Sequence, residues 1–444
     1  MRSIPSVFAR ARALPRSTVA MGALAAALLA AAALVSCQTA ARRGPDAFEP
    51  TVAFGAEPDI RVRVLSGVDG VEIGGPPRIL ARSMLGGERH ELTTPVRLHA
   101  VAGALRLQSA SGDAANFLEP ATIRIDALGG GLMTLDASPY PGSFEARARS
   151  DVAPDAIDLL AIMPMETYLP GVLVKELYPS WPLECYEAQA VCARSYAMHE
   201  RARARSLGRW FDVEGTVVDQ AFSGATEHAT ANAAAEATRG QVITYDGGRL
   251  LRAYYASTCA GRPGSAADTW PTGPGYAFNL AEPLQAHPRD HYCQKSPLYR
   301  WERVRGRERL SLRIRRWGQE NGHPVKTIGQ LAGVEVERRN AAGRPARFML
   351  RDDAARSFSM SAEELRLACN TPVPGVPDLT RDESVRSSDI EVTVEGDKVK
   401  IAGRGFGHGV GMCQFGAAAL AEKGWTHREI IALYYPNTNI QRAY

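Results

Sequence analysis

The sequence lacks the short motifs that by themselves assign a chemistry to a protein. No stretch ends in Gly-Lys-Ser/Thr, which excludes a phosphate-binding P-loop, and none has the Gly-x-Gly-x-x-Gly spacing of a dinucleotide site. His-Glu-x-x-His is also missing, which argues against a zinc peptidase of that type. No long repeat is present. The function must therefore be inferred from longer combinations of residues.

Beyond residue 36 the sequence also lacks an excess of charge of either sign. The formal net charge of the whole chain is +4, and residues 1–36 hold four arginines and no acidic residue. Residues 37–444 are therefore formally neutral, whereas nucleic-acid-binding proteins usually carry a clear basic excess. We expect no nucleic-acid partner. The hydrophobic content of 45% is sufficient for a large core in two subdomains.

The first 36 residues have the pattern of an export signal. A basic stretch precedes an apolar stretch that ends at Val35, and Ser36-Cys37 follow. Because a cysteine directly after Leu-Val-Ser resembles a bacterial lipobox, we predict a lipoprotein signal peptide over 1–36 and lipidation at Cys37. The protein would then be exported and lipid-anchored in the periplasm or cell envelope, through a tether over 37–54. A transmembrane anchor is the alternative, since the apolar stretch is about long enough to span a bilayer.

Cysteine is scarce in this chain. Besides Cys37 there are six cysteines, namely Cys185, Cys192, Cys259, Cys293, Cys369 and Cys413. Outside the cytoplasm some of them should form disulfides. Cys185 and Cys192 fall about two turns apart on one predicted helix, which is too far for a bond between them. We therefore interpret both as small core residues.

Two histidines stand near one of these cysteines, in the pattern His287-x-x-x-His291-x-Cys293. With Cys259 they offer two imidazoles and two thiols, a set that suits tetrahedral zinc. The alternatives are a Cys259–Cys293 disulfide beside two surface histidines, or neither. For an exported protein we favour the disulfide and keep a structural zinc ion as the second hypothesis. The chemistry itself is expected to require no cofactor.

Patterns of apolar and polar residues predict a β-rich subdomain over residues 55–163, followed by helices. Strands are expected at Ile60–Val64, Val96–Leu98, Leu105–Leu107, Ile123–Ile125 and Ile157–Pro164. Helices are expected at Glu166–Leu177, Pro182–Arg205 and Asn232–Thr238. Hairpins are expected at 241–245 with 250–257, and at 390–394 with 398–402. The predicted fold class is α+β.

The second hairpin leads into an unusual run, Gly403–Gly416, in which glycines alternate with other residues, among them His408. Without a Cβ, glycine lets the backbone approach a ligand or another backbone closely, and it adopts positive φ at little cost. A ligand-lining loop and a tight structural turn are both consistent with this run. A helix is expected to follow it, from Gln414 to about Lys423.

Four segments, in this order along the chain, resemble the stage II sporulation protein D family, the SpoIID/LytB domain. They are Met165–Leu177 with Trp181–Ala197, then Ala253–Gly261, then the glycine-rich run with Gln414, and finally Ile430–Pro436. The resemblance covers about 155–440. It implies a SpoIID/LytB-like catalytic domain over 164–444, with an insertion at about 300–389 and a substrate cleft. The β-rich N-terminal subdomain is expected to pack on this mixed helix/strand domain.

The resemblance implies a peptidoglycan lytic transglycosylase, a lyase that cleaves glycan strands stripped of their peptides. The family's catalytic acid falls on Glu176. One carboxyl group is enough for this reaction. It protonates the oxygen between N-acetylmuramic acid and N-acetylglucosamine, and then accepts the proton of the C6 hydroxyl, which closes on C1 to give a 1,6-anhydro end. Such an acid needs a raised pKa, which the apolar neighbours Val172, Leu173, Val174 and Leu177 are expected to provide by desolvation.

Further substrate-binding residues are expected around Glu176. They are Gln189, Arg194, Tyr254, Tyr255, Ser257, Thr258, His408 and Gln414. Because neighbouring residues of a strand point to opposite sides, at most one of Tyr254 and Tyr255 should face a sugar. His408 is expected either to bond a sugar or to orient Glu176. For each residue in this set, a structural role in packing or pairing is the alternative.

Two other functions remain open. The amidase-enhancer branch of the family suggests a non-catalytic module that binds glycan and stimulates an N-acetylmuramoyl-L-alanine amidase. A muramidase, which would release a reducing end, needs a second carboxylate, for which Asp212, Asp219 and Asp268 are available. The expected partners are peptidoglycan glycan strands, a membrane reached through the lipid anchor and, for the first alternative, a cell-wall amidase.

Overall fold

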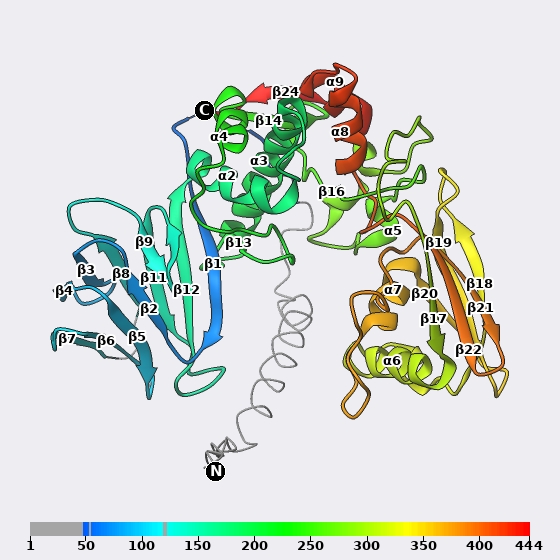
Figure 1. Ribbon diagram of the computed structural model, residues 1–444, viewed down its shortest axis with the longest axis horizontal. Helices are drawn as coiled ribbons and strands as arrows, with labels where there is room; N and C mark the ends of the chain where they lie inside the picture. The colour runs from blue at the N-terminus through cyan, green and yellow to red at the C-terminus, as the bar shows by residue number, and fades with distance from the viewer. Residues whose placement is uncertain (1–47, 53–54, 119–121) are drawn as a thin grey trace, which may run out of the picture. The chain divides into compact units, whose positions relative to one another are not determined.

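The computed structural model describes residues 48–52, 55–118 and 122–444 (Figure 1). The predicted signal peptide, Cys37 and most of the predicted tether lie outside these residues. Among the described residues, no helix is both long and apolar enough to cross a membrane. Helices and several separate sheets make up the chain, which confirms the predicted α+β class.

The first part of the chain forms two sheets with a shared apolar core. The larger sheet has, in spatial order, β13 (Val213–Glu214), β1 (Asp59–Val68), β12 (Ile157–Pro164), β11 (Ser143–Ala148), β8 (Thr122–Ala127), β3 (Arg78–Ser83) and β4 (Arg89–Thr93). The smaller has β10 (Ser138–Tyr140), β9 (Met133–Leu135), β2 (Val71–Gly74), β5 (Val96–Val101), β6 (Ala104–Ser109) and β7 (Ala114–Phe117). Side chains from both sheets, such as Ile60, Leu98 and Ile125, are fully buried in one core. The strands predicted from alternation lie in β1, β5, β6, β8 and β12.

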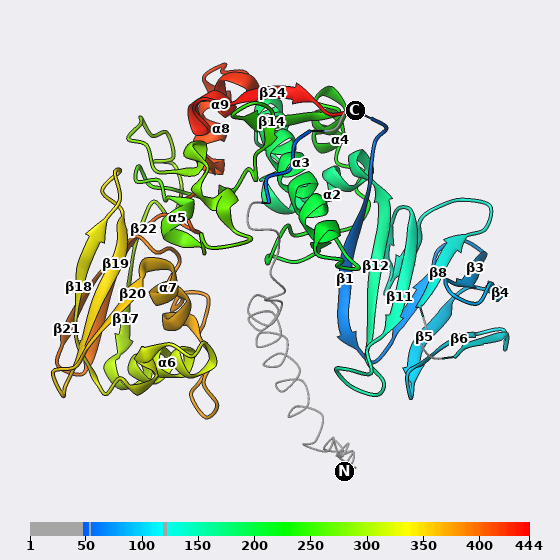
Figure 2. The ribbon, with the colours of Figure 1, turned by 180° about the vertical axis from the view of Figure 1, so that it is seen from behind.

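In the next part, helices surround a small sheet. The helices are α2 (Met165–Glu176), α3 (Leu183–Ser206), α4 (Ala229–Ala237), α5 (Ala266–Thr269), α8 (Gln414–Glu422) and α9 (His427–Tyr434), with short 3₁₀ turns η1 (Ala277–Leu280) and η2 (Glu282–Leu284). The sheet has the order β15 (Arg249–Leu250), β14 (Gln241–Tyr245) and β24 (Asn439–Arg442). Both views show the C-terminus beside α4, where β24 adds to β14 (Figures 1 and 2). Thr426 and Glu429 form a capping box that starts α9.

The predicted hairpin strand over 250–257 is wrong beyond Leu250. The chain leaves β14 there, and Tyr255–Ala256 form β16, which pairs in parallel with β23 (Met412–Cys413) of the glycine-rich run. Glycine explains this pairing. Gly411 has a φ of +73°, and a Cβ on it would meet the carbonyl oxygen of Tyr254. Only a residue without a side chain lets the two backbones approach this closely.

The third part has its own apolar core, in which Ile314, Leu350 and Ile401 are fully buried. It contains β17 (Arg300–Gly306), α6 (Arg307–Glu320), η3 (Pro324–Thr327), β18 (Leu331–Arg339), β19 (Pro345–Asp352), β20 (Ser357–Ser361), α7 (Ala362–Asn370), β21 (Ile390–Glu395) and β22 (Lys398–Arg404). β17 pairs with β22, which in turn pairs with β21. The segment predicted as an insertion therefore shares a sheet with the hairpin that leads into the glycine-rich run.

A buried ion pair joins the helices of the central part. Arg194 of α3 is fully buried, and its Nε and Nη2 donate to the Glu166 carboxylate at 2.9 and 2.6 Å. The Glu166 carboxylate also accepts the backbone N–H of Gly240 at 3.0 Å and the hydroxyl of Tyr444 at 2.6 Å. The remaining Arg194 donors reach the carbonyl oxygens of Gln241 and Ala235. This corrects the prediction that Arg194 binds substrate, because its charge and donors are already used in the core.

We expect Glu166→Gln to lower the free energy of unfolding by about 3–5 kcal/mol, because it leaves the Arg194 charge buried without a counter-charge. Urea unfolding followed by circular dichroism measures this loss. Lys295→Ala is the matched control, since it breaks the exposed ion pair with Glu422 and should cost less than about 1 kcal/mol. Equal stability of the two variants would contradict the role assigned to the buried pair.

Candidate functional site

Glu176 is the last residue of α2. The helix stops there because Leu177 has an extended backbone, with φ −119° and ψ 154°, and because Tyr178 precedes a proline, which disfavours helical conformation. The Glu176 side chain is half-buried, while Leu173 and Leu177 beside it are buried. Desolvation raises the pKa of the Glu176 carboxyl, although hydrogen bonds from Gln414 and from the backbone of Ala221 lower it in part. The site therefore contains a carboxyl group that holds its proton to higher pH than an exposed glutamate does.

Gln414 delivers the side-chain hydrogen bond to Glu176. Its Nε2 lies 3.0 Å from Glu176 Oε2 and 3.5 Å from Oε1 of Gln189. Gln414 is the first residue of α8 and directly follows the glycine-rich run, which brings it next to α2 from a position 238 residues later in the chain. The structure thus groups three of the predicted site residues, Glu176, Gln189 and Gln414.

Gln189 contributes an unused donor to this group. It lies on α3 and is fully buried, and its Nε2 has no hydrogen-bond partner among the described residues. Leaving a buried amide donor without an acceptor costs free energy. A ligand oxygen that reaches this nitrogen would remove that cost. Gln189 is therefore suited to binding a hydroxyl or carbonyl group next to Glu176.

Tyr255, rather than Tyr254, belongs to the Glu176 side. The Tyr255 hydroxyl accepts a hydrogen bond from Gln220 Nε2 at 3.0 Å, and Gln220 Oε1 accepts one from Tyr168 at 3.1 Å. Burial and the nearby negative charge of Glu176 raise the pKa of Tyr255 well above its usual value, so the phenol stays protonated. Tyr254 points the other way, stacks on Trp270 at 4.0 Å and donates to Asn279. The two tyrosines face opposite sides, as the alternation predicts.

The contacts of His408 are with residues other than Glu176. Its Nδ1 accepts the backbone N–H of Val410 at 3.1 Å, and its ring packs edge-on against Trp270 at 4.8 Å. Burial lowers the pKa of His408 to about 4, so the ring is neutral near pH 7. Orienting Glu176 was one of the two roles predicted for His408, and in the structure it is Gln414 that bonds Glu176.

Ser257 and Thr258 differ in accessibility. Thr258 is fully buried, bonds the Ser296 hydroxyl at 2.7 Å and pairs through its backbone with Phe406. These contacts favour a structural role for Thr258 over the predicted role in binding substrate. Ser257 is half-buried, and its carbonyl oxygen accepts the backbone N–H of Phe415 at 3.1 Å. Ser257 thus anchors the start of α8, next to Gln414.

Three aromatic residues beside this group were not predicted. Tyr178, Trp181 and Phe415 pack against one another, with ring centroids between 5.0 and 5.8 Å apart. Tyr178 follows Glu176 by two residues and is 54% exposed, and Phe415 directly follows Gln414. Aromatic rings that remain exposed next to a polar group commonly bind the apolar face of a ligand. The signal in the sequence was the pair of aromatic residues beside prolines after Glu176.

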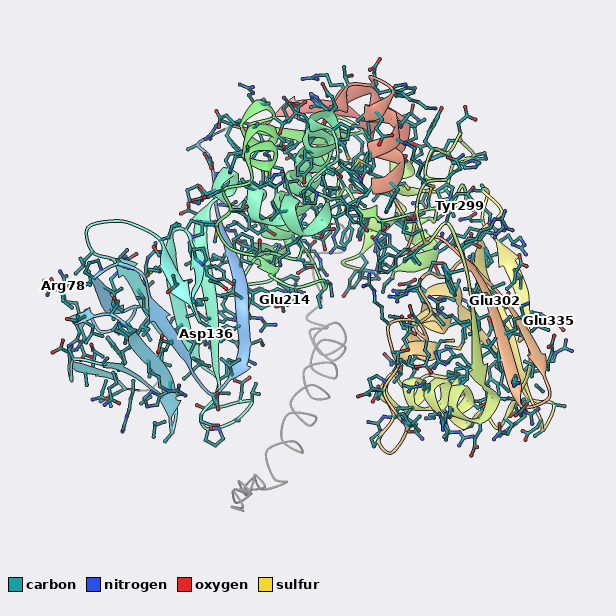
Figure 3. All side chains as sticks on the ribbon, in the orientation of Figure 1. Arg78, Asp136, Glu214, Tyr299, Glu302 and Glu335 are labelled. Carbon is teal, nitrogen blue, oxygen red and sulfur yellow. The ribbon has the colours of Figure 1, made fainter. Side chains whose placement is uncertain are left out.

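The predicted two-cysteine, two-histidine set does not form. His287 bonds the carbonyl oxygen of Glu282 at 3.1 Å, and the exposed His291 stacks with Tyr299, labelled in Figure 3, at 6.3 Å. Cys259 and Cys293 are both free, with their sulfurs 3.9 Å apart, so the expected disulfide is also absent from the described residues. The third thiol near them is that of Cys413, at the end of β23.

Comparison with known proteins gives similarity over two separate segments. Residues 154–245 match the family model described as Stage II sporulation protein (SpoIID), and residues 279–411 match a domain of unknown function (DUF8618). An uncharacterised protein of Brachyspira hyodysenteriae is 27% identical over 62% of this chain and 66% of its own length. The amidase enhancer of Bacillus subtilis is 24% identical, over 61% of this chain and 40% of its own length. Stage II sporulation protein D of Bacillus subtilis is 23% identical, over 63% of this chain and 75% of its own length.

These relatives differ in how much of their length the chain covers. The chain spans less than two thirds of the amidase enhancer and about two thirds of the Brachyspira protein. The SpoIID match begins at residue 154 and ends at 245, so it includes α2 and α3 with Glu176 and Gln189. Gln414 lies outside both matched segments.

We expect Gln414→Met to raise the pKa of Glu176 further, because the variant removes the donor that stabilises the carboxylate. Carboxyl ¹³C NMR across a pH titration measures this, with the Glu176 signal identified by its loss in Glu176→Gln. Gln294→Met, at an exposed glutamine on another loop, should leave the Glu176 titration unchanged. An unchanged or lowered pKa in Gln414→Met would mean that the hydrogen bond does not govern the carboxyl group.

Proposed function

We propose, from the premise that this chain belongs to the SpoIID family, that it is an exported lytic transglycosylase of peptidoglycan. Its substrate is the bond between N-acetylmuramic acid and N-acetylglucosamine in glycan strands, preferably free of peptides. Its product is a 1,6-anhydro-muramic end. The observation that carries the proposal is the half-buried carboxyl group of Glu176, which has a raised pKa and accepts a hydrogen bond from the Gln414 side chain.

The two states of this carboxyl group match the two steps of the reaction. In the protonated state, favoured by desolvation, Glu176 donates its proton to the glycosidic oxygen as that bond breaks. The resulting carboxylate is stabilised by the Gln414 amide at 3.0 Å. It then accepts the proton of the C6 hydroxyl while that oxygen attacks C1. The Glu176 carboxyl group thus gives up one proton and takes up another within a single turnover, and no water is consumed.

The surroundings of the other candidate carboxylates favour a mechanism with one acid. Asp212 is paired with Arg61 at 2.6 Å. Asp219 accepts the Tyr196 hydroxyl and a backbone N–H, both at 2.9 Å. Asp268 pairs with Arg338. A hydrolase of the retaining or inverting type needs a second carboxylate that is free to face the sugar. These three are held in other contacts.

Polar and aromatic groups around Glu176 suit an amino-sugar strand. The unused Nε2 of Gln189 can donate to a hydroxyl or to an acetamido carbonyl oxygen. The rings of Tyr178, Trp181 and Phe415 offer apolar faces against which a pyranose ring can stack. A soluble strand would thus be bound by stacking and oriented by amides, without any need for a charged partner. Lipidation at Cys37, which we also propose, would hold the site near the membrane of the cell envelope.

Glu176→Gln should fold and lose cleavage by about 10²–10⁴-fold, the usual contribution of a positioned acid. Peptide-free strands are incubated with the purified protein, and anhydro-muramic ends are counted by mass spectrometry. Glu187→Gln is the control, because burial also raises the pKa of Glu187, but that carboxyl pairs with His427. Anhydro ends formed by the Glu176 variant at the parent rate would refute the assignment, and reducing ends would indicate a muramidase.

The pH dependence follows from the sign of the pKa shift. Cleavage needs protonated Glu176, so we expect the rate to fall as pH rises through its raised pKa. The folded state also holds this proton at pH values where the unfolded chain has released it. The contribution of Glu176 to the free energy of unfolding therefore decreases as pH rises above about 4.5. Thermal unfolding should show Glu176→Gln equal to the parent below that pH and at least as stable above it. Lower stability of the variant at pH 7 would contradict this.

A second function is favoured by one observation, the similarity to a protein named amidase enhancer. In that case the chain binds glycan without cutting it and increases the turnover of a separate amidase. Strands incubated with amidase alone, with this protein alone and with both separate the two functions. New ends with this protein alone support the transglycosylase. A faster release of peptides only in the mixture, with intact strands and no effect of Glu176→Gln, supports the enhancer.

A further inference from the structure

A cavity in the third part of the chain contains none of the residues that the proposed reaction uses. Its volume is about 370 Å³, and its lining residues come from β17, β21, β22 and the loop around Arg262. Ligand sites in proteins usually measure about 300–1,000 Å³. The cavity is therefore large enough for a small molecule.

The cavity lies on the solvent-facing side of a three-stranded sheet. Its central strand is β22, between β17 and β21. Along β17 the exposed Arg300 and Glu302 alternate with the buried Trp301, and Figure 3 labels Glu302 on this strand. Ala402 of β22 pairs with Glu302 on one side and with Glu391 on the other. A methyl group thus stands between two carboxylates, which leaves space over the middle of the sheet.

Two arginines stand at one end of this space. Arg300 and Arg404 are direct partners across β17 and β22, and like charges in such positions destabilise a sheet. Among the residues that the structure describes, neither guanidinium has a carboxylate at ion-pair distance. Arg262 also lines the cavity, but Asp389 neutralises it at 2.7 Å. The guanidiniums of Arg300 and Arg404 are therefore suited to share one anionic group.

The two carboxylates differ in their partners. Glu302 forms an ion pair with Lys400 at 3.0 Å. Glu391 is exposed, and no cationic side chain of the described ranges lies within ion-pair distance of it. The cavity thus presents unneutralised charge of both signs, two guanidiniums and one carboxylate. A ligand that matches both must itself carry an anionic and a cationic group.

The strand geometry gives the distance between these two groups. Arg404 follows Ala402 by two residues on β22, and Glu391 is the partner of Ala402. At about 3.4 Å per residue, the arginine row and the glutamate row are about 7 Å apart. An extended dipeptide spans about the same length, at about 3.3–3.6 Å per residue. A single amino acid reaches only half as far.

We propose that this cavity binds a dipeptide whose two ends are free, with its carboxylate on Arg300 and Arg404 and its ammonium group on Glu391. The binding is non-covalent and separate from the Glu176 group. All three of these residues fall within 279–411, the segment that matches a domain of unknown function, so the proposal gives that domain a ligand. Such dipeptides come either from cell-wall peptides, which contain D-amino acids, or from proteins, which contain L-amino acids.

Calorimetric titration of the full chain with D-alanyl-D-alanine and with L-alanyl-L-alanine tests this. We expect saturable binding of at least one of them, and the tighter enantiomer identifies the source. Acetylating its amine or amidating its carboxylate should weaken binding at least about tenfold, because each change removes one charge-assisted hydrogen bond. Free alanine should be weakened by a similar factor. No saturable binding up to about 10 mM, or equal binding of the blocked dipeptides, would overturn the proposal.

Variants locate the site. Arg404→Gln and Glu391→Gln should each weaken binding at least about tenfold, since each removes the charge that faces one end of the ligand. Glu335→Gln and Arg351→Gln are the matched controls, because these residues form an exposed ion pair at 3.5 Å on β18 and β19 of the same part. They should bind the dipeptide like the parent.

Circular dichroism shows whether each variant is folded, and both site variants replace residues outside the apolar core. Parental affinity in folded Arg404→Gln or Glu391→Gln would overturn the proposal. The titrations need no glycan. A protein that binds the dipeptide but cleaves no strand would therefore refute the proposed function and leave this site intact, whereas cleavage without dipeptide binding would do the reverse.

Discussion

The ion pair between Glu166 and Arg194 is the interaction on which the arrangement of the site depends. It joins the first turn of α2 to the middle of α3, and through Gly240 and Tyr444 it also holds the segments beside β14 and β24. Glu176 lies at the other end of the same helix, about 15 Å away at 1.5 Å per residue. Because a helix is stiff over this length, fixing its first turn also fixes the direction in which Glu176 points.

Two glutamates of one helix thus have opposite environments. The Glu166 carboxylate accepts hydrogen bonds from Arg194, Gly240 and Tyr444. Glu176 is half-buried, and among the residues that the structure describes only the Gln414 side chain donates to it, so desolvation raises the pKa of its carboxyl group. The two carboxyl groups thus differ in the number and charge of the donors around them, since Glu166 faces a guanidinium and Glu176 a neutral amide.

Sequence patterns were sufficient where the cause of a feature is local. The apolar neighbours of Glu176 predict its raised pKa, and strand alternation predicts that Tyr254 and Tyr255 face opposite sides. Both properties depend on residues within a few positions of the one concerned. The α+β class follows in the same way from short-range periodicity.

Sequence patterns failed where the partner is distant. Nothing near Arg194 shows that Glu166 neutralises it inside the core, and nothing near Cys259 or Cys293 shows that Cys413 is the third thiol. The pairing of β16 with β23, which ended the predicted hairpin at Leu250, depends on a glycine far along the chain. In each case the deciding contact joins segments that only the folded chain brings together.

The long separation between partners also sets the order in which the site can assemble. The Gln414–Glu176 contact closes a loop of 238 residues, and a bond from Thr244 of β14 to Asn439 of β24 joins residues 195 positions apart. Contacts of such high sequence separation form late and slowly, because the chain loses the entropy of loop closure before the contact contributes any stabilisation. During synthesis, which proceeds from the N-terminus, α2 is therefore made long before Gln414, whose amide bonds Glu176. The hydrogen bond between Gln414 and Glu176 can therefore form only after the C-terminal part of the chain has folded against α2, and its presence indicates that folding is complete.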